Sequence, residues 1–578
     1  MELPEFRIRG KEVIDYVTDY LENIQERRVV SNVKPGYLTP LLPKEAPQKP
    51  EDWGEIMNDV EKLIMPGITH WQHPQFHAYF PSGNAGPSIL ADIISDAIGC
   101  VGFSWVASPA CTELETIVLD WFGRALNLPP KFLFFEPESC GGGVIQTSAS
   151  ECILVCMLAA RTEAIKYLMK MEGALPGTES MFLPRLVAYC STESHSCVEK
   201  NAMISLVKLR ILEVDEHGSL RGETLREAIE EDIKAGLHPF FVSAILGSTA
   251  ICSFDKLTEI GEIVQNLPAC WFHVDGAYAG SGFICPENQY LMEGIHYADS
   301  FNTNCNKWLT ICYDCSCLWV KDRKKLTSAL VVDPIYLQHA NSDVTIDYRH
   351  WCIPLSRRFR SLKLWFTFRA FGIEGLQAYI RNHCELALYF EKLVLNDDRF
   401  EICNEVKLGL VCFRLKGKPD QSVEYMEKLN QTLLSDINAA GKVHMIPCKS
   451  KGRYTIRFCV TYPNATREMI GKPSLIHSRP TLHCYKTHLN FITDYSWKII
   501  QEHATSLFES EQILAEKKAA PKKRISRKFS FIRSVSREIY ETRQSRGSLH
   551  DGAMPILIPQ NDPTPSSNEN EDEDVFFD

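Results

Sequence analysis

Residues 298–309 read ADSFNTNCNKWL, a polar run that ends in one lysine, Lys307, followed by an apolar Trp-Leu pair. Upstream, residues 272–280 read FHVDGAYAG, and their apolar start predicts a buried β-strand that ends on Asp275. Downstream, residues 315–322 read CSCLWVKD and predict another strand. The polar run between these strands predicts a loop, so the sequence places an acid at the end of one strand and a lysine on the loop that follows.

An acid at a strand end and a lysine on the next loop are the two groups that a pyridoxal phosphate site requires. The lysine amine forms a Schiff base with the cofactor, and the acid keeps the pyridine nitrogen protonated so that the ring accepts electrons. Each residue also has a plainer interpretation, with Asp275 as a helix cap and Lys307 as a surface lysine. Because either residue alone is more often of the plainer kind, the rest of the chain has to decide.

Length and composition predict a soluble enzyme with two or three domains. At 578 residues the chain is too long for one core, and its hydrophobic content of 45% is ordinary for a globular protein. The net charge of -11 argues against nucleic acid as the main partner. No apolar run is long enough for a signal peptide or a membrane span, so the 21 cysteines are expected as reduced thiols in the cytoplasm.

Cys312, Cys315 and Cys317 lie close together in the sequence. No second pair of cysteines or histidines at ligand spacing completes a zinc site, so no bound metal is expected.

The first 85 residues predict helices without a core of their own. Apolar residues recur at helical spacing over residues 10–29, and a second helix is expected over residues 53–64. The segment 1–85 is expected to pack on the main domain or on a second copy of the chain. Its last part, residues 70–84, is aromatic and either lines the core or forms one wall of an aromatic substrate pocket.

Residues 86–371 predict an α/β domain with a mainly parallel sheet. A helix over residues 151–168 alternates with short apolar runs of strand length, namely residues 185–190, 240–246 and 271–274. The glycine-rich run at residues 140–151 predicts a loop leading into that helix, where backbone amides and hydroxyls favour phosphate. It lacks the Gly-Lys-Ser/Thr ending of a nucleotide P-loop, and a simple glycine turn remains the alternative.

Two further segments of this domain carry expectations. Residues 329–346 predict a long loop that contains Tyr336, and loops of this length in compact domains are often lids. Residues 355–371 predict a basic amphipathic helix that packs across domains rather than on a membrane surface.

The remainder predicts a small domain and a tail. Residues 400–417 and 454–462 predict antiparallel strands of an α+β domain over residues 372–510. From residue 511 to 578 a basic, serine-containing run is followed by an acidic end, which predicts a disordered tail. Ser530 and Ser536 are candidate phosphorylation sites there, although a solvated tail without a switch is the simpler interpretation.

Eight motifs, read together and in order, resemble the group II pyridoxal phosphate-dependent amino-acid decarboxylases, which include the aromatic amino acid and histidine decarboxylases. They are HWQHPQFHAYFP, SWVASPACTELE, GGGVIQTSASE, STESHSCVEK, HVDGAYAG, NTNCNKWL, DPIYLQH and DYRHWCIPLSRRFRSLKLW. The resemblance covers residues 1–460, and within the group it is strongest to the invertebrate tyrosine decarboxylases, which make tyramine. It implies the fold type I architecture of aspartate aminotransferase and a homodimer with interlocked N-terminal segments and its active site at the interface.

The resemblance also implies roles for single residues. Lys307 would hold the cofactor covalently, Asp275 would pair with the pyridinium nitrogen, and His195 would stack on the ring and help to orient the substrate carboxylate. Tyr336 would protonate the substrate Cα after carbon dioxide leaves. The other cofactor contacts would be Ser148, Ala149, Ser150 and Asn304 at the phosphate, Thr249 and Ala277 beside the ring, and Asn306 next to the lysine. The substrate pocket would consist of Trp71, Tyr79, Phe80, Pro81, Ser82 and Ser356, with Val101 and Phe103 of the partner subunit.

The implied reaction is decarboxylation of an aromatic L-amino acid, with L-tyrosine first. Histidine decarboxylase is the first alternative, a dopa or 5-hydroxytryptophan decarboxylase the next, and an inactive scaffold that binds the cofactor is the alternative outside the enzymes. Relatives that act as aldehyde synthases have another residue at the position of His195 or of Tyr336. Both residues are present here, so the resemblance implies decarboxylation to the amine rather than formation of an aldehyde. Ser356 stands where dopa-type enzymes have glycine, which does not separate histidine from tyrosine.

The chain departs from the family pattern at a few positions. Cys305 stands where proline is usual, Gly276 where alanine is usual, Asn306 where many members have histidine and Ser248 where threonine is usual. Gly276 is expected to add backbone freedom next to Asp275. Residues 471–492 form an insertion of about twenty residues before or within the last helix of the small domain. The hypothesis that this segment is unspliced is tested by peptide mapping of the natural protein, and its intact recovery would contradict it.

Overall fold

The computed structural model describes residues 1–338, 341, 345–463 and 491–519. Residues 1–508 form one compact unit and residues 509–578 a second. All but the last two residues of the insertion at 471–492 lie outside the described residues, as do Ser530 and Ser536 in the predicted tail. The division of the chain at residues 85, 371 and 510 stays a prediction.

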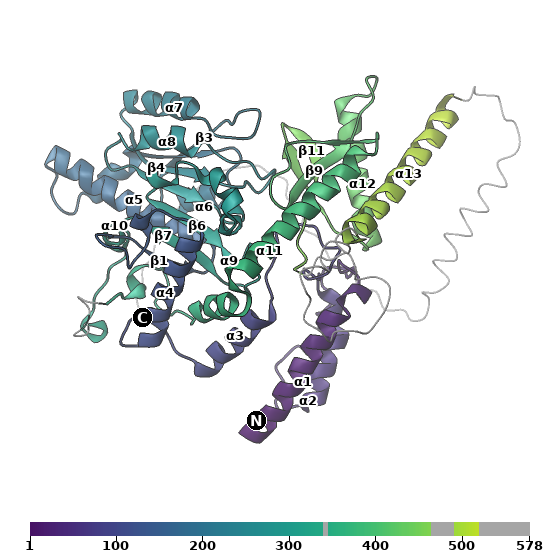
Figure 1. Cartoon of the computed structure of the whole chain (residues 1–578), viewed down its shortest axis with the longest axis horizontal. Coiled ribbons are helices and arrows are strands. Elements are labelled where there is room, and N and C mark those ends of the chain that lie inside the picture. Colours follow the sequence, from purple (N-terminus) through teal and green to yellow (C-terminus); the bar gives the residue numbers. More distant parts are fainter. Residues whose placement is uncertain (339–340, 342–344, 464–490, 520–578) are drawn as a thin grey trace, which may run out of the picture. The chain divides into compact units, whose positions relative to one another are not determined.

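The first unit contains a seven-stranded sheet in the order β1-β7-β6-β5-β4-β2-β3. Figure 1 shows its strands among helices such as α5, α7 and α8. Strands β6, β5, β4, β2 and β3 are parallel to one another, and β7 runs antiparallel to both β6 and β1. The strands are β1 (Gly142–Gln146), β2 (Leu186–Ser191), β3 (Lys208–Leu212), β4 (His238–Ile245), β5 (Trp271–Asp275), β6 (Ser300–Asn304) and β7 (Ser316–Val320). Because most of these strands are buried along their whole length, the sheet is covered on both faces, and the predicted α/β fold is confirmed.

Helices connect and cover these strands. Helix α5 buries eleven of its side chains and lies where the sequence predicts a helix over residues 151–168. The helices of this part are α3 (Gly86–Ile98), α4 (Pro109–Ala125), α5 (Ala149–Glu172), α6 (Cys197–Ile204), α7 (Gly222–Lys234), α8 (Leu257–Val264), α9 (Cys305–Trp308) and α10 (Arg323–Thr327).

The polar run before Lys307 is the buried strand β6, so the predicted loop is wrong. Polar side chains are tolerated inside a sheet when they have hydrogen-bond partners. Ser300 Oγ accepts a hydrogen bond from Trp271 Nε1 at 2.7 Å, and Asn302 Nδ2 donates to Asp275 Oδ1 at 3.0 Å. Lys307 itself lies in the short helix α9, directly after this strand.

The glycine-rich run at residues 140–151 contains the strand β1 and the start of α5, which corrects the prediction of a glycine loop. Gly142 and Gly143 belong to β1, and a Cβ on Gly143 would lie 3.0 Å from side-chain atoms of both Leu119 and Trp319. The glycine therefore lets α4 and β7 pack closely on β1. The turn into α5 is only Thr147 and the N-cap residue Ser148, whose Oγ accepts a hydrogen bond from the backbone N–H of Glu151.

The predicted antiparallel strands of the C-terminal region are confirmed. Four strands form a sheet in the order β10-β11-β9-β8, and every pairing in it is antiparallel. Its elements are β8 (Phe400–Ile402), β9 (Leu410–Leu415), α12 (Val423–Ala440), β10 (Ile446–Ser450) and β11 (Arg453–Cys459). Helix α13 (Phe491–Ala519) continues into the predicted tail, so the expectation of disorder is wrong for residues 511–519.

The basic helix expected over residues 355–371 begins later, at Ser361. Arg357 and Arg360 precede it and are buried in ion pairs rather than exposed on a helix face, Arg357 with Glu115 and Arg360 with Asp314. The helix is α11 (Ser361–Leu395), and it is interrupted at Gly372, where φ is 64°.

The N-terminal helices are α1 (Leu3–Glu22) and α2 (Trp53–Asp59), the latter continued by a π-helical turn over Val60–Ile64. Tyr16 Oη donates to Glu61 at 2.8 Å and joins the two. Helix α1 buries none of its side chains, which agrees with the expectation that this segment has no core of its own. None of the helices in the described ranges is both long and apolar enough to cross a membrane.

Candidate active site

The predicted site residues follow strands that end at one edge of the large sheet. The parallel strands β2, β4, β5 and β6 place their carboxyl ends together, and β1 runs the same way because both β1 and β6 are antiparallel to β7. Ser148 follows β1, His195 follows β2, Thr249 follows β4, Asp275 ends β5 and Lys307 follows β6. This edge is where open α/β sheets bind their ligands.

Asp275 is held in one orientation by its neighbours. Its Oδ1 accepts hydrogen bonds from Asn302 Nδ2 and from the backbone N–H of Ala277, both at 3.0 Å. Its Oδ2 has no hydrogen-bond partner among the described residues, although the side chain is only 9% exposed. One carboxylate oxygen is therefore fixed while the other is available to a ligand.

Lys307 presents its amine to the same space. Burial lowers the pKa of the amine, Asp275 opposes that shift, and the positive charge of Arg457 adds to it. In the part of the chain that the structure describes, Nζ makes neither a hydrogen bond nor an ion pair, and it lies 5.5 Å from the centre of the Phe80 ring. A lysine amine with a lowered pKa is more readily neutral and can act as a nucleophile.

His195 is placed by the turn after β2. Its Nδ1 accepts a hydrogen bond from the backbone N–H of Cys197 at 3.1 Å, so in the neutral ring the proton is on Nε2. Burial lowers the pKa of His195, and the positive charge of Lys307 lowers it further against the opposing effect of Asp275. The ring is therefore neutral at pH 7 and able to donate a hydrogen bond through Nε2.

An aromatic stack supports the lysine. Phe80 stacks on Tyr278 with ring centres 3.9 Å apart, and Tyr278 stacks on Trp308 at 4.5 Å. Trp308 follows Lys307 in α9, and its Nε1 donates to His383 Nδ1 at 3.0 Å. The position of the lysine is therefore fixed by packing from three segments that are distant in the sequence.

Arg457 belongs to this site and is missing from the sequence-based set. It is 1% exposed, its Cζ lies 5.1 Å from the centre of the Phe80 ring, and its Nε donates to the carbonyl of Ala250 at 3.1 Å. No carboxylate pairs with it within the described ranges, so a buried positive charge faces the region of Lys307. In YTIRFCVTY the apolar residues alternate with Thr455, Arg457 and Cys459, so the pattern predicts an outward side chain for Arg457 and gives no signal of its burial.

The other predicted residues divide into two groups. Four of the predicted cofactor residues lie at the same sheet edge, namely Ala149, Ser150, Asn304 and Ala277. The segment at residues 79–82 runs beside the turn that carries Lys307, because the backbone N–H of Gly83 donates to the carbonyl of Asn306 at 2.8 Å. Asn306 Oδ1 accepts from the backbone N–H of Cys315, so this oxygen holds the turn, and the cofactor contact of Asn306 stays a prediction. No described hydrogen bond or ring contact joins Val101, Phe103 or Ser356 to Lys307 or Phe80, and the side chain of Tyr336 lies outside the described residues.

Gly276 is not the flexible point that the sequence suggests. Its backbone N–H donates to the carbonyl of Asn302 at 3.0 Å, and an added Cβ would lie 2.8 Å from Phe301 Cε2. The absence of a side chain is used for close packing of β5 on β6. The expectation of added backbone freedom is therefore wrong.

The groups at this edge fit pyridoxal phosphate. The amine of Lys307 can bond to its aldehyde, and the free oxygen of Asp275 can accept a hydrogen bond from the protonated pyridine nitrogen. The first turn of α5, with Ser148 as its N-cap, offers backbone N–H groups and a hydroxyl to the phosphate. These three kinds of group correspond to the aldehyde, the pyridine nitrogen and the phosphate of the cofactor.

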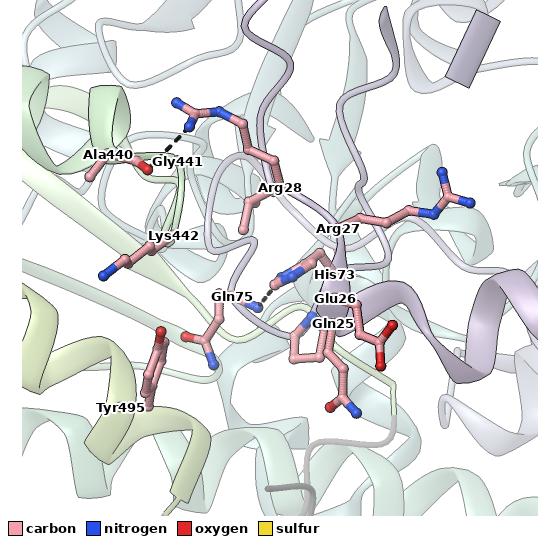
Figure 2. A pocket seen from close by; sticks show the side chains of 12 residues that line it. Gln25, Glu26, Arg27, Arg28, His73, Gln75, Ala440, Gly441, Lys442 and Tyr495 are labelled. Atoms are coloured by element: carbon pink, nitrogen blue, oxygen red, sulfur yellow. Dashed lines mark hydrogen bonds between the residues drawn. The ribbon is translucent and has the colours of Figure 1, made fainter. Parts of the chain in front are cut away.

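A separate cavity of about 490 Å³ lies where residues 25–29 meet the end of α12. Figure 2 shows Arg28 reaching the carbonyl of Ala440, and it donates to this oxygen at 3.3 Å. Arg28 also donates to the carbonyl of Ala439 at 2.6 Å, so it satisfies the carbonyl groups at the end of that helix. None of the predicted cofactor or substrate residues lines this cavity.

Comparison with known proteins gives a consistent result. Residues 35–416 match the family model described as the pyridoxal-dependent decarboxylase conserved domain. The aromatic-L-amino-acid decarboxylase of Mus musculus is 53% identical over 463 residues, which cover 80% of this chain and 94% of that protein. The histidine decarboxylase of Drosophila melanogaster is 51% identical over 473 residues, which cover 82% of this chain and 54% of that protein. The crystal structure of Oryza sativa TDC with PLP and tryptamine has a TM-score of 0.79 at 32% identity and covers 88% of this chain and 99% of that one.

Proposed function

The chain belongs to the pyridoxal-dependent decarboxylases, and on this premise we propose that it converts L-tyrosine to tyramine. At the coarser level it is a carboxy-lyase of the aromatic amino acid or histidine decarboxylase type. The observation that supports tyrosine is the aromatic wall beside Lys307. Trp71 and Tyr79 stack with ring centres 5.0 Å apart and an interplanar angle of 12°. Phe80 directly follows Tyr79, and its ring centre lies 5.5 Å from Lys307 Nζ.

Pyridoxal phosphate, when bound, supplies a conjugated ring that takes up the electron pair left at the substrate Cα when carbon dioxide departs. Lys307 would hold the cofactor, and its amine, whose pKa is lowered by burial, would serve as a nearby base. Asp275 keeps a negative charge fixed at the edge of the sheet through the hydrogen bonds from Asn302 and Ala277. His195 donates a hydrogen bond from Nε2 to the substrate carboxylate, and Tyr336 returns a proton to Cα.

The assembly that we propose is a homodimer in the cytoplasm, with the site at the interface. Its support is the apolar surface that one chain leaves open. On α1, Leu3 is 81% and Phe6 58% exposed, and on α3, Leu90 is 49% and Ile98 56% exposed. Apolar patches of this kind mark protein interfaces. The partner subunit's Val101 and the partner subunit's Phe103 would then complete the substrate pocket.

Histidine and dopa are the alternatives to tyrosine. An imidazole needs polar partners, whereas a phenol needs an aromatic slot with one partner for its hydroxyl. Phe80, whose ring centre lies 5.5 Å from Lys307 Nζ, and the stacked Trp71 and Tyr79 are aromatic, which favours a phenol over an imidazole. Ser356, which is exposed, is the polar residue that would favour histidine if it entered the pocket of the assembled enzyme.

The test is a competition. The purified, cofactor-loaded protein receives equimolar tyrosine, dopa, histidine and 5-hydroxytryptophan, and amines, aldehydes and peroxide are measured in the same vials. Tyramine as the main product without peroxide is expected. Histamine as the main product would contradict the proposal, and the absence of any amine would favour the inactive scaffold.

A matched pair of variants links the product to the aromatic wall. Trp71→Leu is expected to lower kcat/KM for tyrosine by about two- to twelvefold, because a stacked aromatic pair contributes about 0.5–1.5 kcal/mol beyond the area that it buries. Trp121→Leu is the control, because Trp121 is 43% exposed, close to the 41% of Trp71, but lies on α4. Equal effects of the two substitutions on kcat/KM would refute a substrate role for Trp71.

A further inference from the structure

Three buried cysteines meet beside the lysine turn. Cys305 is the first residue of α9, Cys317 belongs to β7, and Cys315 immediately precedes that strand. Their Sγ atoms all lie within 4.8 Å of one another, and the Cys305 and Cys317 sulfurs are 3.4 Å apart. Each residue is 0% exposed. The pairing of β6 with β7 produces this meeting, because the backbone N–H of Cys305 donates to the carbonyl of Cys315 at 3.0 Å.

This cluster differs from the group Cys312, Cys315 and Cys317, which lie close together in the sequence. Cys312, which neighbours Cys315 in the sequence, is not part of it, and its backbone N–H donates instead to Ser88 Oγ at 2.8 Å. The third member is Cys305, ten residues before Cys315, and only the strand register brings it in. A search for ligands at short spacing therefore cannot find this group.

Positive side chains lie next to the cluster. Arg360 pairs with Asp314 at 2.7 Å, and Asp314 directly precedes Cys315 in the chain. Lys363 Nζ donates to the carbonyl of Asp314 at 3.1 Å, next to Cys315 in the chain. Thiolates are the form of cysteine that binds metal ions.

We propose that Cys305, Cys315 and Cys317 bind one soft, thiophilic cation, and that this cation is Cu(I). An ion bonded to three sulfurs at about 2.3 Å holds them about 4 Å apart, which is within the spread of the cluster. Structural zinc sites take four ligands, whereas the group found among the described side chains has three, all sulfur. Thiolate ligands select Cu(I), and binding displaces the thiol protons.

The site has a mechanical consequence for the enzyme. Lys307 lies two residues after Cys305 in α9. An ion bonded to Cys305 on one side and to Cys315 and Cys317 on the other links the start of this turn to β7. Copper binding therefore raises the resistance of the folded protein to heat without requiring contact with substrate.

Copper retention by the full-length protein tests the proposal. The protein, purified under reducing conditions and freed of metal, is loaded with Cu(I) and then dialysed against the Cu(I) chelator bicinchoninate, and copper per chain is measured. The wild type is expected to keep one copper ion per chain and to show a higher Tm with copper than without it. Cys305→Ala and Cys317→Ala are each expected to lose both the copper and this increase in Tm. Cys156→Ala is the matched control, because Cys156 is also 0% exposed but lies outside the cluster.

Two further measurements keep the outcome decisive. X-ray absorption of the copper-loaded wild type is expected to show three sulfur neighbours at about 2.3 Å. This measurement uses the wild type alone and does not depend on whether the alanine variants fold. Equal copper retention in the cluster variants and in Cys156→Ala would overturn the proposal. Retention of zinc in preference to copper, or a Cys305–Cys317 disulfide found by peptide mapping of the freshly purified protein, would overturn it as well.

Discussion

The substitution Glu115→Gln removes the acid from an ion pair that is closed to water. The side chain of Glu115 is 1% exposed and that of Arg357 is 2% exposed. Arg357 donates to Glu115 through both terminal nitrogens, at 2.5 and 3.0 Å, and the backbone N–H of Ile145 donates to the same carboxylate at 2.8 Å. Through the Ile145 backbone the pair connects β1 to the segment before α11. The end of β1 leads to Ser148.

The expected loss of stability follows from burial. Burial alone would lower the pKa of Arg357, but Glu115 raises it above its usual range, so the guanidinium stays charged. A buried charge left without its partner costs about 3–5 kcal/mol, a large fraction of a total stability of about 5–15 kcal/mol. The exposed pair Arg381–Glu287 has a closest contact of 2.5 Å, yet its side chains are 44% and 50% exposed, and such pairs contribute about 0–1 kcal/mol.

Urea unfolding followed by tryptophan fluorescence measures the difference. Glu115→Gln is expected to lower the midpoint strongly and Glu287→Gln to leave it nearly unchanged. The double variant Glu115→Leu with Arg357→Met is expected to recover most of the loss, because apolar residues of similar volume often replace a buried pair without cost. A loss in Glu115→Gln no larger than that in Glu287→Gln would refute the reasoning.

Two more predictions concern pH and packing. Burial lowers the pKa of His273 to about 4 from 6.5, so the unfolded chain takes up the proton first, and stability is lost as the pH falls from about 6.5 to about 4. His273→Asn is expected to reduce the dependence of stability on pH by up to about 1.4 kcal/mol per pH unit. Urea midpoints measured across that pH range test this, and an unchanged dependence would contradict the role given to His273. Gly276→Ala is expected to cost about 1–3 kcal/mol because its Cβ would lie 2.8 Å from Phe301 Cε2. Gly54→Ala, with nothing within 4 Å, serves as the control in the same unfolding assay, and equal costs would show that Phe301 moves freely aside.

The sequence predicts the elements whose apolar runs match their burial. Strands β2, β4 and β5 lie within a residue or two of their predicted ranges, and Asp275 ends its strand as expected. The polar strand β6 escapes prediction, because its side chains are satisfied by partners such as Trp271 that are distant in the sequence. The same strand register brings Cys305 to Cys317, so neither the strand nor the thiol cluster has a local signal.

The site shows the same limit. Lys307, Asp275 and His195 have recognisable motifs, whereas Arg457 reaches the region from β11, almost two hundred residues beyond Asp275 in the printed sequence. Its burial against Phe80 depends on how β11 and the segment at residues 79–82 pack on the large sheet. Composition and spacing describe each strand separately and therefore cannot place a charge that arrives from another sheet.

The most direct test of the central claim is the stoichiometry of carbon dioxide and tyramine released from L-tyrosine by the cofactor-loaded protein. Release of the two in equal amounts is expected, with no aldehyde or peroxide and with no product from a Lys307→Ala variant. Carbon dioxide accompanied by aldehyde and peroxide would contradict the account, and so would full turnover without Lys307.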